Sequence, residues 1–172
     1  YTKLVTQMHL DGYAVESYQF PVIVDERKAG STLLQRLLGI LDLPVDQEIL
    51  MLYTSFVPRW GAALLWSYGR DVDGIGVGST GGGVELDGEL PALDWETFAR
   101  DLRLARRRRD DVFIFSLEGC IEQGFLTRLS EMDWSSPPSM PVRGARHVDH
   151  LRRLAQAVLW TSAHPIIVLI GL

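Results

Sequence analysis

The chain alternates short, almost wholly apolar segments with segments whose apolar residues recur every three or four positions. The first kind is typical of strands buried on both faces, and the second kind of helices with one apolar side. Four such pairs follow one another. The predicted strands span 13–18, 48–55, 74–79 and 111–117, and the predicted helices span 29–41, 59–69, 95–109 and 120–132. Repeated strand–helix units predict an α/β fold with a mainly parallel sheet and right-handed crossovers.

The last part of the chain predicts one more helix and an apolar ending. The helix spans 145–161, and the apolar residues on one of its sides are Val148, Leu151, Leu154, Ala155 and Val158. Residues 155–172 carry no charge other than a possible one on His164. They are either a helix end followed by a buried strand over 166–172, or the start of a transmembrane span that is cut short. Threonine, serine, histidine and proline interrupt the apolar run, which favours the first interpretation.

Two architectures fit this alternation. One is an open doubly wound sheet, and the other is part of a (β/α)8 barrel. A whole barrel needs about 250 residues, so the 172 residues present hold about half of one. The sequence starts at Tyr1 rather than at a methionine and ends on PIIVLIGL, so both ends look cut. We therefore expect either a single α/β domain over 1–172 or, preferably, the C-terminal part of a larger barrel domain.

Composition excludes several classes of partner. A net charge of −5 and a pI near 5.3 argue against nucleic acid, because phosphate binding needs a basic surface. The single cysteine excludes an internal disulfide, and the four histidines lack zinc-finger spacing. No metal or other cofactor is therefore expected. The residues do not indicate a cell compartment, although no signal peptide is visible.

In both architectures ligands bind at the carboxyl ends of the strands. The polar and aromatic residues expected at those ends, with one tryptophan from the helix after the second strand, are Glu16, Tyr18, Ser55, Trp66, Ser79, Thr80 and Glu118. Because the strands are predicted to be parallel, these residues should share one rim. They are the candidate site residues of this sequence.

Glu16 and Glu118 end the first and fourth predicted strands, three strands apart. This layout resembles the (β/α)8-barrel glycoside hydrolases, which place an acid/base glutamate after strand 4 and a nucleophile glutamate after strand 7. The resemblance implies a carbohydrate ligand, with Glu16 as the acid/base and Glu118 as the nucleophile. The aromatic residues that could stack on its sugar rings are Tyr13, Tyr18, Tyr53, Trp60 and Trp66. Cleavage of a glycosidic bond requires one protonated and one ionised carboxyl group. The alternative is that both glutamates are solvated and have no catalytic role. Glu118 lies near the start of a helix, where a negative charge is favourable in any case.

Two other functions remain open. The segment GIGVGSTGGGV is rich in glycine, and its residues 76–83 could let backbone N–H groups approach a phosphate, with Ser79 and Thr80 adding hydroxyl donors. This alternative is a non-catalytic α/β module that binds a phosphate-bearing ligand. The other is a structural or membrane-linked domain with no small-molecule site, whose partner is the rest of a longer chain or a second copy.

Overall fold

The structure contains a four-stranded, all-parallel sheet, as the strand–helix alternation predicts. It is a computed structural model, and it describes residues 1–78, 93–136 and 143–164. The strands are β1 (Glu16–Gln19), β2 (Gln47–Met51), β3 (Gly74–Gly78) and β4 (Asp111–Phe115). They lie in the order β1-β2-β3-β4, and each neighbouring pair is parallel. Among these strands the order never reverses, whereas a doubly wound sheet is defined by such a reversal.

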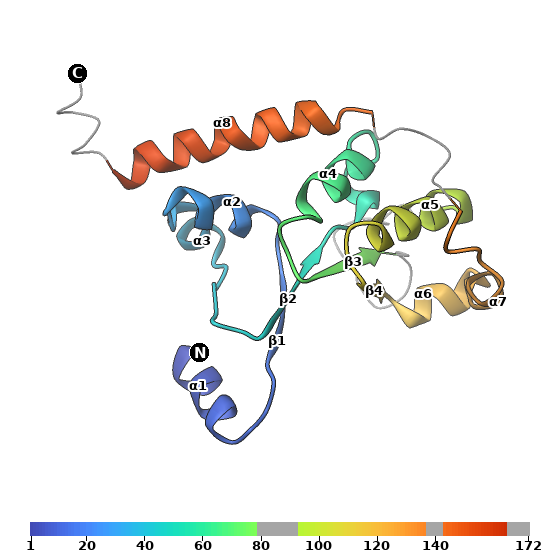
Figure 1. Cartoon of the computed structure of the whole chain (residues 1–172), viewed down its shortest axis with the longest axis horizontal. Coiled ribbons are helices and arrows are strands. Elements are labelled where there is room, and N and C mark those ends of the chain that lie inside the picture. Colours follow the sequence, from blue (N-terminus) through green and yellow to red (C-terminus); the bar gives the residue numbers. More distant parts are fainter. Residues whose placement is uncertain (79–92, 137–142, 165–172) are drawn as a thin grey trace.

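The connections between the strands are helical (Figure 1). The helices are α1 (Thr2–Leu10), α2 (Val22–Ala29), α3 (Leu33–Leu38), the 3-10 helix η1 (Thr54–Phe56), α4 (Gly61–Tyr68), α5 (Trp95–Arg106), α6 (Leu117–Glu122), α7 (Phe125–Ser130) and α8 (Ala145–Ala163). Helix α5 starts where the sequence predicts, because the Asp94 carboxylate accepts a hydrogen bond from the Thr97 N–H at 2.7 Å. Helix α4 likewise confirms the predicted helix over 59–69.

One face of the sheet is covered by helices and forms the core. The strand register places Leu50, Ile75 and Val112 side by side on this face. Leu50 and Ile75 are fully buried and belong to one apolar cluster with Leu65 of α4 and Phe98 of α5. Successive residues of a strand point to opposite faces. The residues that alternate with Leu50, Ile75 and Val112 therefore line the other face.

That other face has glycines in its middle and aromatic residues at its sides. It carries Gly74, Gly76 and Gly78 of β3, flanked by Phe113 and Phe115 of β4 on one side and by Tyr18 of β1 and Ile49 and Met51 of β2 on the other. Tyr18 is 52% exposed and Phe115 40% exposed. We call this surface the glycine face. On the covered face Leu50 and Ile75 are fully buried, so the two faces differ in how far their side chains are exposed to solvent.

The predicted helix over 29–41 is shortened to α3, and α2, which the sequence did not predict, precedes it. Helix α2 begins earlier, at Val22, and ends at Gly30, whose φ of 64° is the left-handed conformation that glycine adopts readily. Helix α3 follows at Leu33. Its first turn is capped by the buried Glu26 carboxylate, which accepts hydrogen bonds from the N–H groups of Leu34 and Gln35 at 2.6 and 2.9 Å.

Three other boundaries differ from the sequence prediction. The predicted helix over 120–132 is broken into α6 and α7 at Gly124, which has a φ of 65°. Helix α1 was not predicted at all, and it lies beyond the amino ends of the strands in Figure 1. The first strand begins at Glu16 rather than at residue 13. The predicted last strand over 166–172 lies outside the described residues.

Helix α8 packs across α2 and α4 rather than on the sheet (Figure 1). Its buried residues are Val148, Arg152 and Leu159. The predicted apolar side is therefore mostly not the buried side, since of its members only Val148 is buried and Leu151, Leu154 and Val158 are more than half exposed. Within the described residues, no helix is both long and apolar enough to cross a membrane.

Candidate ligand site at the carboxyl edge of the sheet

An apolar cavity of about 640 Å³ lies at the carboxyl ends of β1 and β2. Its walls come from the turn after β1, the segment from β2 to η1, helix α4 and the end of β4. The lining residues are Phe20, Pro21, Val22, Met51, Leu52, Tyr53, Thr54, Phe56, Val57, Gly61, Leu64, Leu65, Tyr68 and Phe115. Parallel sheets bind ligands at this edge, and the volume is that of a small-molecule site.

Three aromatic rings are stacked at the mouth of this cavity. The ring of Tyr53 lies 5.6 Å from that of Phe115, with an interplanar angle of 17°, and 6.1 Å from that of Phe56. Burial raises the pKa of the Tyr53 phenol, and nearby Tyr18 raises it further. Tyr53 is therefore a neutral phenol at ordinary pH. Phe56 and Phe115 both remain partly exposed, so aromatic surface is available to a ligand.

The glycines of β3 make room for these rings. A Cβ atom built on Gly78 would lie 3.0 Å from Cγ of Tyr53. A Cβ atom on Gly74 would lie 3.0 Å from Cε2 of Phe113. Both distances are shorter than ordinary carbon–carbon contacts. The glycine pattern of this strand therefore has a structural explanation up to Gly78, and the rest of the proposed phosphate loop, including Ser79 and Thr80, lies outside the described residues.

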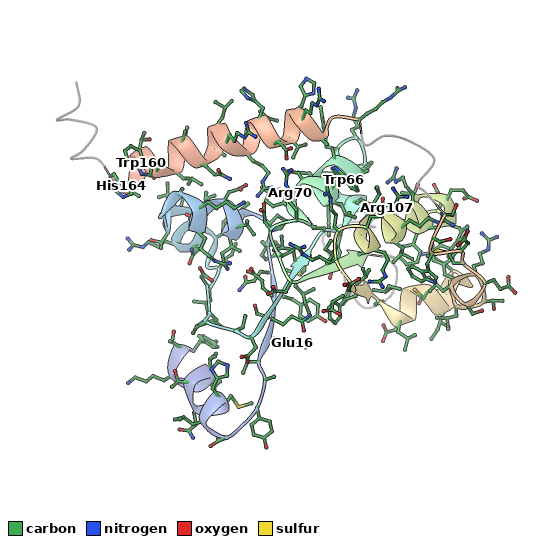
Figure 2. The ribbon with its side chains drawn as sticks, viewed as in Figure 1. Glu16, Trp66, Arg70, Arg107, Trp160 and His164 are labelled. Carbon is green, nitrogen blue, oxygen red and sulfur yellow. The ribbon has the colours of Figure 1, made fainter. Side chains whose placement is uncertain are left out.

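Glu16 does not lie at the carboxyl edge, which corrects the sequence prediction. It is the first residue of β1 and is level with Gln47, the first residue of β2. Gly74 and Asp111 are both level with Ile49, two residues farther along. In Figure 2 Glu16 lies toward the α1 end of the molecule. Its side chain is exposed there.

Glu118 lies at the opposite end of the sheet, in the first turn of α6 just after β4. Ser116 caps this helix by accepting a hydrogen bond from the Gly119 N–H at 3.2 Å, which fixes the turn that carries Glu118. Glu118 is exposed and lies three residues beyond Phe115, a wall of the cavity. Six residues of strand separate the level of Glu16 from that of Phe115, about 20 Å along the sheet. The expected carboxylate pair is therefore not formed.

The other predicted site residues are dispersed. Tyr18 lies on the glycine face, where its ring meets that of Phe113 edge-on at 6.1 Å. Ser55 lies in η1, and its buried hydroxyl has no hydrogen-bond partner among the residues that the structure describes. Trp66 is not a wall of the cavity. Its ring lies 3.3 Å below the Arg108 guanidinium (ring centroid to Cζ), and Figure 2 shows it on α4 beside Arg70.

The buried Asp101 supports the cavity wall from behind. Its carboxylate on α5 accepts hydrogen bonds from the Thr54 hydroxyl and from Nε of Arg100, the latter at 2.9 Å. Burial raises the pKa of the Asp101 carboxyl group, although the hydrogen bond from Thr54 and the charge of Arg100 oppose this effect. Gly61 of α4 permits the close approach of η1, because a Cβ atom there would lie 2.4 Å from Cβ of Thr54.

The sequence prediction missed most of the residues that form the cavity, although it named Tyr53 as a stacking surface. It searched strand ends mainly for polar groups, whereas the other aromatic walls are Phe20, Phe56 and Phe115. The available signal was the recurrence of aromatic residues at or just after the ends of three of the four strands. Two of these residues, Phe20 and Phe56, are about half exposed.

No group of three or more histidine, cysteine, aspartate or glutamate residues in the described part of the chain is placed to hold a metal ion. The lone Cys120 is buried in the core. Comparison of the chain with protein-family models, with curated proteins and with solved structures gave no match.

Proposed function

We propose that the chain is part of a (β/α)8-type barrel, similar in layout to the glycoside hydrolases, that binds a glycoside at the carboxyl edge of its sheet. The consecutive order of four parallel strands supports this architecture. So does the glycine face, because the inward side of a barrel must hold its side chains in a confined space. The cavity with its aromatic mouth is the observation that carries the function.

The walls of the cavity favour an amphiphilic ligand, that is, a sugar joined to an apolar group. The lining is almost entirely apolar, so it matches an alkyl or aryl substituent better than a ring of hydroxyl groups. At the rim of the cavity, the partly exposed rings of Phe56 and Phe115 offer flat surfaces to the C–H face of a sugar. The apolar group would then occupy the cavity while the sugar lies at its rim.

Glu118 is the proposed polar contact for that sugar. It stands on a capped first turn just beyond Phe115, where an ionised carboxylate can accept hydrogen bonds from sugar hydroxyls. Glycosidic cleavage would need a second carboxyl group within about 9.5 Å, and Glu16 does not supply it. The proposal is therefore for glycoside binding, with Glu118 as a ligand contact rather than as half of a catalytic pair.

Calorimetric titration with three probes tests this proposal. Octyl glucoside below its micellar concentration should bind more tightly than either glucose or octanol, because only the glycoside fills both parts of the site. The substitution Glu118→Gln should weaken octyl glucoside binding about tenfold, the usual effect of losing a charged hydrogen-bond acceptor. Octanol binding should be unchanged in this variant.

Glu122→Gln is the matched control, since Glu122 is exposed on the same helix, one turn farther on. It should leave all three affinities unaltered. If octanol binds the native chain as tightly as octyl glucoside, the cavity holds an apolar ligand and the carbohydrate proposal fails. It also fails if none of the three probes binds.

A further inference from the structure

Helix α8 presents an apolar stripe away from the body of the protein. Leu151, Leu154 and Val158 are three and four residues apart, so they lie along one side of the helix. Their exposed fractions are 59%, 51% and 67%. This α8 stripe is independent of the cavity and of the proposed glycoside site.

The side of α8 that faces the protein combines the buried apolar residues Val148 and Leu159 with a buried arginine. Arg152 is buried and donates hydrogen bonds from Nε and Nη2 to Oδ1 of Asp25 in α2, at 3.0 and 2.8 Å. Its Nη1 donates to the Ser67 carbonyl at 2.9 Å, and Nη2 also donates to Asp71 at 2.8 Å. The helix is therefore attached through a side that carries a buried ion pair and two apolar residues, and its apolar stripe has no intramolecular role among the described residues.

Basic residues accompany the stripe. Arg146, His147, His150 and Arg153 are all exposed on α8. The only carboxylate of the helix, that of Asp149, is turned inward and bonded to Ser67 and Arg70. The outward side of α8 thus combines apolar and cationic groups without an opposing acid.

Trp160 lies with the arginines rather than with the stripe. It is 41% exposed, and it lies seven and fourteen residues beyond Arg153 and Arg146, so the three share one side of the helix. With 3.6 residues per turn, this side is about 130° around the helix from the α8 stripe. Figure 2 shows Trp160 at the C-terminal end of α8, beside His164. The sequence that follows, residues 165–172, reads PIIVLIGL and has no charge.

We propose that α8 binds the surface of an anionic lipid bilayer, with its axis in the membrane plane and the α8 stripe inserted among the acyl chains. Amphipathic helices with a basic polar side bind in this way. The arginines would reach anionic headgroups while the leucines enter the apolar layer. The bilayer thus matches both the apolar and the cationic groups.

A second copy of the chain matches the stripe less well. Parallel pairing of two α8 helices would place arginines and histidines against each other. Antiparallel pairing would place Arg146 and Arg153 of one copy beside residues 155–163 of the other, which contain no acid. Neither arrangement neutralises the charges, whereas anionic lipid does so in either orientation of the helix.

Co-sedimentation with vesicles tests the proposal on the 172-residue chain. The chain should sediment with vesicles of phosphatidylserine and phosphatidylcholine and remain in solution with phosphatidylcholine alone. Added salt should weaken binding, because exposed charges are screened. The double substitution Leu154→Ser and Val158→Ser should reduce the affinity about a hundredfold, the effect of losing two inserted aliphatic side chains. Arg146→Gln with Arg153→Gln should reduce it about twentyfold.

Leu4→Ser with Leu10→Ser is the matched control. These leucines are 60% and 76% exposed on α1, at the other end of the molecule in Figure 1. The control should bind vesicles like the native chain. Equal binding to both kinds of vesicle, or no binding to either, overturns the proposal. So does a dimer in light scattering that the Leu154→Ser, Val158→Ser variant converts to a monomer without any vesicle binding in the native chain.

Discussion

Two buried carboxylates, those of Glu26 and Asp101, have specific hydrogen-bond partners. Glu26 caps α3, and Asp101 joins α5 to η1 through Thr54. Both carboxylates are fully buried, a position that charged side chains rarely occupy without hydrogen bonds. Such groups stabilise one arrangement of helices because any other arrangement would leave them unpaired. Their effect on stability is therefore testable one residue at a time.

Asp101 gives a prediction about pH. Burial raises the pKa of its carboxyl group in the folded chain, so the folded state binds this proton more tightly than the unfolded state, where the pKa is about 3.9. The contribution of Asp101 to stability should therefore fall as pH rises above about 4 toward the raised folded pKa. Asparagine keeps both contacts, since its amide oxygen can accept from Arg100 and its N–H can donate to the Thr54 hydroxyl.

Urea unfolding of the Asp101→Asn variant from pH 4 to pH 7 measures this effect. The free energy of unfolding of the variant, relative to the native chain, should increase with pH. Asp110→Asn is the control, because the Asp110 side chain is 94% exposed. A pH-independent difference between the native chain and Asp101→Asn would show that the Asp101 carboxyl group has the same pKa in both states.

At the scale of elements, the sequence predicts what local patterns determine. Strands β2, β3 and β4 were found because each contains a run of apolar or glycine residues, and α5 because its capping residue and its apolar side are local. Glu16 was misplaced because strand ends are less sharply marked, and a shift of three residues moved it from the end of β1 to its start. The attachment of α8 was missed because Arg152 is matched by Asp25, 127 residues away.

The buried pair of Arg152 and Asp25 gives the prediction at this scale. Arg152→Met should lower the free energy of unfolding by about 3–5 kcal/mol, because it leaves a buried carboxylate without its cation. Adding Asp25→Asn should recover part of this loss, since the unpaired charge is then removed. Arg153→Met, an exposed neighbour on the same helix, should change stability by less than about 0.5 kcal/mol.

Guanidinium unfolding monitored by circular dichroism measures all three variants. The double-mutant cycle gives the coupling between the two side chains. If Arg152→Met and Arg153→Met had equal effects, α8 would not depend on the buried ion pair. Its attachment would then have to come from Val148 and Leu159, its buried apolar residues.

At the scale of the whole molecule, one face of the sheet is covered by helices, and the other is the glycine face with its partly exposed aromatic rings. On the covered side, Phe98 is fully buried and stacks on Phe125, with 5.3 Å between ring centroids. On the glycine face, Tyr18 is half exposed. Within residues 1–78, 93–136 and 143–164, helices cover one side of the sheet only. The proposed barrel would have the same arrangement, with the glycine face turned toward its interior. The two faces should therefore respond differently to loss of an aromatic ring.

Phe98→Ala should lower the free energy of unfolding by about 3–5 kcal/mol, because it leaves a cavity in the core. Tyr18→Ala should lower it by less than about 1 kcal/mol in the 172-residue chain, since an exposed ring loses few contacts. Urea unfolding at neutral pH compares the two. A cost for Tyr18→Ala equal to that for Phe98→Ala would mean that the glycine face is closely covered in solution. In that case the face would be a second core of this chain, and the argument that connects it with the interior of a larger barrel would fail.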